Sequence, residues 1–107
     1  MDKEYQIEGA KMTYRMPKEV DHHKTMILRN QLDRLIEAHQ IRELVLDFSE
    51  TDFMDSSGIG VIIGRTKTMK FFGGTVEAVN LSAQIKKICR ASGLHRMINI
   101  REGEGND

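Results

Sequence analysis

Two adjacent hydroxyl side chains, Ser56 and Ser57, are the residues of this chain best suited to chemistry. They follow Asp55 and precede Gly58 and Gly60, at the predicted junction between a strand and a helix. Junctions of this kind are where α/β folds place their functional loops. A serine in the first turn of a helix can cap the helix, accept a phosphate or act as a nucleophile. Which of these three roles the serine pair has must be judged from the neighbouring residues.

Nucleophilic catalysis by Ser56 has no supporting residues in the sequence. The surrounding residues are not G-x-S-x-G, and no histidine is placed to act as a base. The lysine and glycine spacing of a P-loop is missing, and so is G-x-G-x-x-G. Asp21, His22 and His23 could suggest a metal site. Adjacent helix residues point about 100° apart, however, and the sequence has no further ligand nearby, so a metal site is not favoured. We therefore predict no catalytic residue, no metal and no cofactor.

The glycines of this segment need a physical reason, because a glycine costs roughly 1 kcal/mol in a helix interior. Gly58 and Gly60 both lie within the predicted second helix. The usual reason for such glycines is the close approach of another backbone or of another protein surface. The start of this helix is therefore the strongest candidate for a functional surface.

Hydrophobic periodicity predicts the elements that position this segment. Residues 3–8 and 11–16 alternate with a period of two, which indicates a hairpin that Pro17 ends. Asp21 stands where a helix N-cap belongs, ahead of an amphipathic helix of about 16 residues. The inner stripe of that helix is predicted to be Leu28, Leu32, Leu35 and Ile36.

The remaining chain alternates between strands and helices. Leu44 to Phe48 is a nearly continuous apolar run, expected for a central strand covered on both faces. A second helix from about Ser56 is closed by Gly73-Gly74, and strands are predicted at 75–79 and 97–100. Between those strands lies a third helix from Ser82 to Gly93, with Ile85, Ile88 and Cys89 inside. The alternation predicts an α/β domain with a mixed, mostly parallel sheet, an antiparallel N-terminal hairpin and helices packed against it.

Length and composition limit the classes of function. The 107 residues suit one domain, predicted over residues 1–101, followed by a polar flexible tail at 102–107. Sixteen basic and sixteen acidic residues leave no net charge to attract nucleic acid or an anionic membrane. The single cysteine excludes an internal disulfide. No stretch has the length of a membrane span or the pattern of a signal peptide, so we expect a cytoplasmic protein.

The motif F-M-D-S-S-G-I-G-V-I-I-G-R at residues 53–65 resembles the STAS domains, and within them the bacterial anti-sigma factor antagonists. The resemblance is strongest to the subgroup that acts on anti-sigma F factors in sporulating bacteria. Asp21-His22-His23, Ile41-Arg42 and Ser92-Gly93-Leu94 also have counterparts in that subgroup. The resemblance covers residues 4–100, and the D-S-S-G-x-G core is highly specific at this place in the fold. Residues 1–101 would accordingly form a STAS-like domain.

The resemblance implies a phosphorylation switch and no enzymatic activity. In such proteins the unphosphorylated form binds an anti-sigma factor, itself a serine kinase of the GHKL type, and so releases the sigma factor. Carried over by position, Ser56 is the phosphoacceptor, and its phosphorylation blocks binding. A metal-dependent serine phosphatase would reset the switch, with no direct contact to nucleic acid or membrane. The partner-binding residues would be Asp21, Asp55, Ser57, Gly58, Ile59 and Gly60.

Two departures from the family pattern affect these expectations. Lys18-Glu19-Val20-Asp21, preceded by Pro17, replaces the G-E-L-D-like string of many members, which alters the loop beside the binding surface. The family's C-terminal helix has no counterpart here, which would leave one sheet face open to weak self-association. Two other functions remain open: a STAS adaptor in another signalling complex, and a small-ligand or nucleotide sensor that uses the same helix start.

Overall fold

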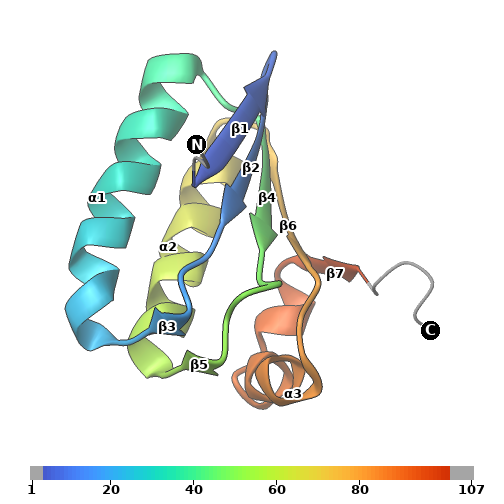
Figure 1. The fold of residues 1–107 in the computed structure, drawn as a ribbon. Helices are drawn as coiled ribbons and strands as arrows, with labels where there is room; N and C mark the ends of the chain where they lie inside the picture. The colour runs from blue at the N-terminus through green and yellow to red at the C-terminus, as the bar shows by residue number, and fades with distance from the viewer. Residues whose placement is uncertain (1–3, 102–107) are drawn as a thin grey trace.

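A computed structural model describes residues 4–101 as a five-stranded sheet with two long helices on one face (Figure 1). The helices are α1 (His22–His39), α2 (Ser56–Phe71) and α3 (Ala83–Ala91), and a short 3-10 helix, η1 (Leu94–Arg96), follows α3. The strands are β1 (Tyr5–Glu8), β2 (Lys11–Arg15), β3 (Glu19–Val20), β4 (Glu43–Asp47), β5 (Phe53–Met54), β6 (Thr75–Val79) and β7 (Asn99–Arg101). The predicted tail at 102–107 lies outside the described residues.

The main sheet has the strand order β1-β2-β4-β6-β7. Strands β1 and β2 pair antiparallel, and every other neighbouring pair in this sheet is parallel. Parallel neighbours need crossover connections, and α1, α2 and α3 supply them in turn. The predicted mixed, mostly parallel sheet with an antiparallel N-terminal hairpin is therefore confirmed.

The core lies between the sheet and the α1–α2 layer. Met12, Leu44 and Val76 are neighbours across β2, β4 and β6 and are buried on the same side. Leu32 of α1 and Ile62 of α2 cover them in one apolar cluster. The inner stripe predicted for the first helix is buried as expected, which confirms its helical period: Leu28, Leu32, Leu35 and Ile36.

The opposite face of the sheet is more polar than the sequence indicated. Val45 is buried there, but its neighbours in the register are Thr13 and Glu77. The Glu77 carboxylate lies 3.0 Å from Nε of Arg101 and accepts a hydrogen bond from the Asn99 amide. Leu44, Val45 and Leu46 are all buried, which confirms the expected central strand covered on both faces, although the neighbours of Val45 on this face are polar. Self-association through the other face would have to rely on polar groups.

The residues at the helix ends confirm the predicted helix caps. The carboxylate of Asp21 accepts a hydrogen bond from the Lys24 amide and caps α1, and the Ser82 hydroxyl caps α3 in the same way. Gly93 and Gly73 follow the ends of α3 and α2 with φ of 82° and 79°, the left-handed region that glycine adopts without strain. Gly74 packs against the carbonyl oxygen of Arg42, so a Cβ there would collide with backbone.

Cys89 is fully buried on the inner face of α3, as predicted. Burial raises the pKa of its thiol to about 11, so the thiolate is disfavoured near neutral pH. The residue acts as a small hydrophobic side chain.

In the described part of the chain, no helix is both long and apolar enough to cross a membrane.

Candidate functional site

A second, two-stranded sheet sets up the candidate site. Strands β3 and β5 pair in parallel, with Val20 opposite Met54, and the Val20 carbonyl accepts a hydrogen bond from the Asp55 amide. Both strands therefore end at the same edge, and the next residue of each, Asp21 or Asp55, caps the helix that follows. The register of this small sheet brings two predicted partner-binding carboxylates together, although they are far apart in the sequence.

The N-cap of α2 is Asp55, not a serine hydroxyl. Its carboxylate accepts hydrogen bonds from the amides of Ser57 at 2.9 Å and Gly58 at 3.3 Å. The two serines lie at the first and second positions of the helix, so the capping role that was open to a serine hydroxyl is filled by Asp55. The physical reason is that a carboxylate accepts charge-assisted bonds from two amides at once. Ser56 is thereby released from any capping role.

Ser56 is exposed in the first turn of α2. Its hydroxyl has no hydrogen-bond partner within residues 4–101. An exposed and unengaged hydroxyl on a fixed helix start can be approached by another protein without local unfolding. Of the two serines, Ser56 is therefore the more accessible one.

Ser57 is half-buried and turned toward α1. Its hydroxyl lies 3.3 Å from Nδ1 of His22, the first residue of that helix. The sequence analysis argued against a metal site at His22 and did not anticipate this contact. The only signal in the sequence was its position directly after the Asp21 cap. The histidine adjoins the second serine, so it offers no base to Ser56.

The predicted partner-binding glycines have different environments. A Cβ on Gly58 would lie 2.6 Å from Cγ of Met54 and 2.8 Å from Cγ1 of Val20. Gly58 is therefore needed for close packing of α2 on the small sheet, within this chain, and Ile59 beside it is also buried. Gly60 is exposed, and no atom lies within 4 Å of its Cβ position. Of these two glycines, only Gly60 therefore has no packing reason within the described residues to be glycine.

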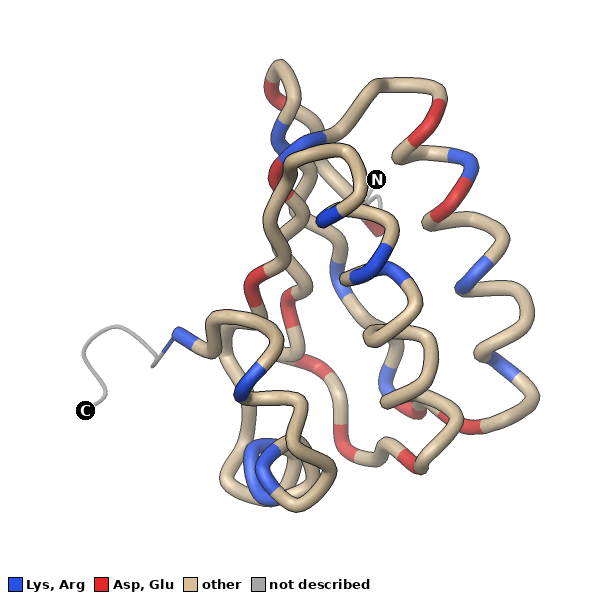
Figure 2. Tube along the Cα trace, turned by 180° about the vertical axis from the view of Figure 1, so that it is seen from behind, with Lys and Arg blue, Asp and Glu red and all other residues tan. Residues whose placement is uncertain are grey.

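Acidic residues surround the start of α2. Figure 2 shows Asp and Glu gathering at the end of the molecule that carries β3, β5 and the first turn of α2. Lys18 pairs with Asp52 there at 3.6 Å, and both side chains are mostly exposed. A further carboxylate, Glu50, lies 3.6 Å from Arg15. Two of these carboxylates are therefore paired with cations, while those of Asp21 and Asp55 cap helices.

Exposed apolar side chains occur on the first turns of α1 and just before α2. Met26 and Ile27 on α1 are 58% and 65% exposed, and Phe53, three residues before Ser56, is 45% exposed. Sequence reasoning did not single out these residues, because their exposure depends on how α1 sits against α2. Apolar groups beside a charged rim are typical of protein interfaces.

Among the described residues no cluster of three or more His, Cys, Asp or Glu could hold a metal ion.

The sequence of this chain is similar to a known domain family and to named bacterial regulators. A family model described as "STAS domain" matches residues 3–106. The anti-sigma F factor antagonist of Paenibacillus polymyxa is 35% identical over 92 residues, which cover 86% of this chain and 79% of the relative. The anti-sigma-B factor antagonist of Bacillus subtilis is 33% identical over 82 residues, covering 77% and 73% of the two chains.

Solved structures share the fold. The anti-sigma factor antagonist SpoIIAA in its unphosphorylated form superposes with a TM-score of 0.82 at 24% identity, covering 94% of this chain and 89% of that one. Its phosphorylated form, described as a Bacillus cell fate determinant, gives 0.74 at 24% identity with 94% and 92% covered. The fold and the site together define a STAS domain. The chain belongs to the anti-sigma factor antagonist family, whose members are regulators and not enzymes.

Replacement of Asp55 by alanine is expected to lower the free energy of unfolding by about 1 kcal/mol, because two amides at the start of α2 lose their acceptor. Asp55→Asn should lose much less, since asparagine also caps well. Asp52→Ala is the matched control, because it removes only an exposed ion pair that contributes little. Urea unfolding of the three variants measures the difference. An equal loss in Asp52→Ala and Asp55→Ala would show that the cap is not the cause.

Proposed function

We propose that this chain is an anti-anti-sigma factor switched by phosphorylation of Ser56. The unphosphorylated form binds an anti-sigma factor that is also a GHKL-type serine kinase, and the bound kinase releases its sigma factor. The observation that carries the proposal is the exposed, unengaged hydroxyl of Ser56 at a helix start capped by Asp55. The capping carboxylate leaves that hydroxyl available to the kinase.

The phosphorylated domain is expected to keep its fold. A phosphate on Ser56 adds about 1.5 to 2 negative charges at the N-terminus of α2, where the helix dipole favours an anion by roughly 0.3–1 kcal/mol. Asp55 and Asp21 oppose the charge, but solvent screens exposed charges effectively. These effects are small and opposite in sign. The switch therefore acts on the surface and not on the fold.

The binding surface that we propose surrounds Ser56. Asp21, Asp55, Ser57 and Gly60 reach the surface or come close to it, while Gly58 and Ile59 support it from beneath. The exposed apolar residues Met26, Ile27 and Phe53 extend it. A phosphate enclosed between this surface and a partner would lose its water, and a buried dianion without a cation costs several kcal/mol. Desolvation and steric exclusion thus explain how one modification blocks binding.

The remaining parts of the cycle follow from the same switch. A metal-dependent serine phosphatase would return phosphorylated Ser56 to the hydroxyl form. We place the chain in the cytoplasm, where sigma factors act, without direct contact to nucleic acid or membrane. The relatives are named for two sigma factors, sigma F and sigma B, so the sigma factor controlled by this chain could be either one. We favour sigma F, because the sigma F relative is more similar to this chain over a longer stretch.

Mass spectrometry after incubation with ATP and a candidate anti-sigma kinase tests the proposal. We expect a single phosphate on Ser56, absent in Ser56→Ala and retained in the matched variant Ser57→Ala, because Ser57 is half-buried. Parallel reactions with an anti-sigma F and an anti-sigma-B kinase distinguish the two regulons. A phosphate on Ser57, or none with a kinase proven active on its own antagonist, would contradict the proposal.

A further inference from the structure

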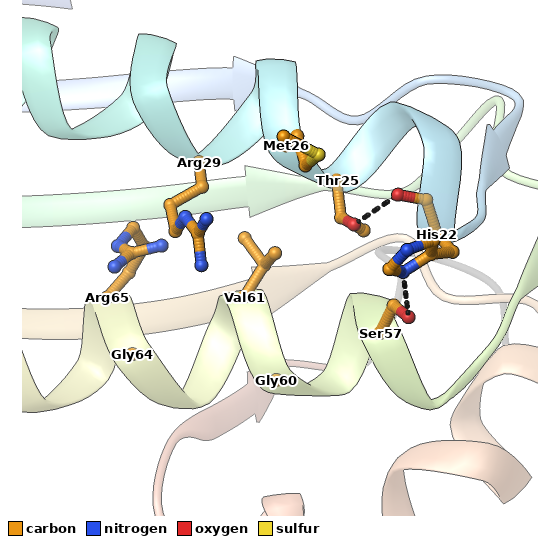
Figure 3. A pocket seen from close by; sticks show the side chains of 9 residues that line it. All are labelled: His22, Thr25, Met26, Arg29, Ser57, Gly60, Val61, Gly64 and Arg65. Carbon is orange, nitrogen blue, oxygen red and sulfur yellow. Dashed lines mark hydrogen bonds between the residues drawn. The ribbon is translucent and has the colours of Figure 1, made fainter.

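A cavity of about 370 Å³ lies between α1 and α2, and Ser56 is not among the residues that line it. Ser57 and His22 line one part of it, and Arg29 and Arg65 line another (Figure 3). The volume is at the lower end of the range of small-molecule sites. None of the roles proposed for Ser56 uses the two arginines.

Arg65 is a buried cation with incomplete pairing. The residue is 7% exposed, and its Nε lies 2.9 Å from Oδ1 of Asp33 as an ion pair, although without hydrogen-bond geometry. Its Nη1 atom is also buried and has no hydrogen-bond partner among residues 4–101. A guanidinium nitrogen held out of water without an acceptor is costly, and native proteins rarely retain one without a reason.

A second guanidinium shares the cavity. Figure 3 shows Arg29 of α1 and Arg65 of α2 turned toward each other across it. Burial lowers the pKa of Arg65, the carboxylate of Asp33 raises it, and the like charge of Arg29 lowers it further. Two cations thus face one carboxylate, and the side chain of Asp33 is itself 47% exposed. The local charge favours an added anion.

The α2 wall of the cavity is open beside these cations. Gly60 and Gly64 are one turn apart and both line the cavity. No atom lies within 4 Å of the Cβ position at either glycine. Packing within the chain therefore does not require glycine at either position, whereas a side chain at either one would take up space in the cavity.

We propose that the cavity between α1 and α2 binds a small oxyanion, a carboxylate or a phosphate group, on the free Nη1 of Arg65 and on Arg29. A guanidinium fork matches two oxygens of either group. The hydroxyl of Ser57 and the ring of His22 can receive a second polar group of a larger ligand. The site does not rest on phosphorylation of Ser56, so the two proposals can fail separately.

Titration of the ¹⁵N-labelled protein with sodium phosphate or with sodium acetate, at ionic strength held constant with sodium chloride, tests the site. We expect saturable shifts of the Gly60 and Gly64 amides and of the Arg65 Nε–H, with a dissociation constant on the order of 1 mM for the better anion. The stronger of the two anions identifies phosphate or carboxylate as the ligand class. The absence of saturable shifts with both anions would overturn the proposal.

Variants make the assignment specific. Arg65→Met should weaken binding at least tenfold and still fold, because it removes a buried and incompletely paired cation. Arg29→Met removes an exposed cation from the same cavity and should also weaken binding, which keeps the test valid if Arg65→Met unfolds. Arg90→Met on α3 is the control and should bind as the wild type does. Unchanged affinity in both cavity variants would disprove the site.

Discussion

Phosphorylation of Ser56 is expected to weaken binding of the anti-sigma factor by about a thousandfold, which corresponds to about 4 kcal/mol of binding free energy. The residue is exposed in the first turn of α2, so the phosphate is fully hydrated before binding. In the complex that water is displaced, and Asp55 and Asp21 add repulsion from this side of the interface. Isothermal titration calorimetry of the phosphorylated and unphosphorylated protein against the kinase measures the effect.

Two substitutions control this experiment. Ser56→Ala should bind as tightly as the unmodified protein, because the hydroxyl makes no bond within residues 4–101 and alanine leaves the surface unblocked. Ser56→Asp should weaken binding less than the phosphate does, since it carries one charge and less bulk. All forms should melt at similar temperatures. Loss of binding by a folded Ser56→Ala would mean that the hydroxyl itself is a required contact.

The mechanism also predicts which residues change their backbone chemical shifts on phosphorylation. If the phosphate blocks contact without refolding, changes in backbone chemical shift should be confined to the start of α2 and the adjoining β3–β5 sheet. Widespread shifts in β6 or β7 would show instead that phosphorylation changes the fold. That outcome would replace the blocking mechanism even if affinity falls as expected.

Gly58→Ala is expected to lower the free energy of unfolding by about 1–3 kcal/mol, although alanine is the better helix former. The added methyl group would lie 2.6 Å from Cγ of Met54 and 2.8 Å from Cγ1 of Val20, so α2 must move away from the small sheet. Both of those side chains are themselves buried and have little room to yield. Urea unfolding of the variant measures the loss.

Gly60→Ala is the matched substitution two residues further along the same helix. No atom lies within 4 Å of its Cβ position, so alanine should raise the free energy of unfolding by about 0.5–1 kcal/mol. If Gly60 is also part of the partner surface, the same variant should bind the anti-sigma factor more weakly while being more stable. Destabilisation by both substitutions to the same extent would refute the packing explanation for Gly58.

Much of the fold could be predicted because its signals are local. The period of two in residues 11–16, the helical stripe from Leu28 to Ile36 and the caps at Asp21 and Ser82 each depend on neighbours within one or two turns. The β3–β5 pair was missed because strands of two residues carry no periodicity. The polar far face of β4 was missed because an apolar run does not reveal what its neighbours in the sheet contribute.

The amino-acid sequence alone was enough to predict the long helices and the strands of the main sheet, the sheet type, the family motif and the position of the serine pair on a helix start. The three-dimensional packing was needed to show which residue caps that helix, that Gly58 packs against Val20 and Met54, and that His22 adjoins Ser57. It also placed Arg29 and Arg65 around one cavity. The reason is physical: periodicity and caps are fixed by residues close in sequence, whereas exposure, pairing and cavities depend on elements that meet only when α1, α2 and the small sheet pack together.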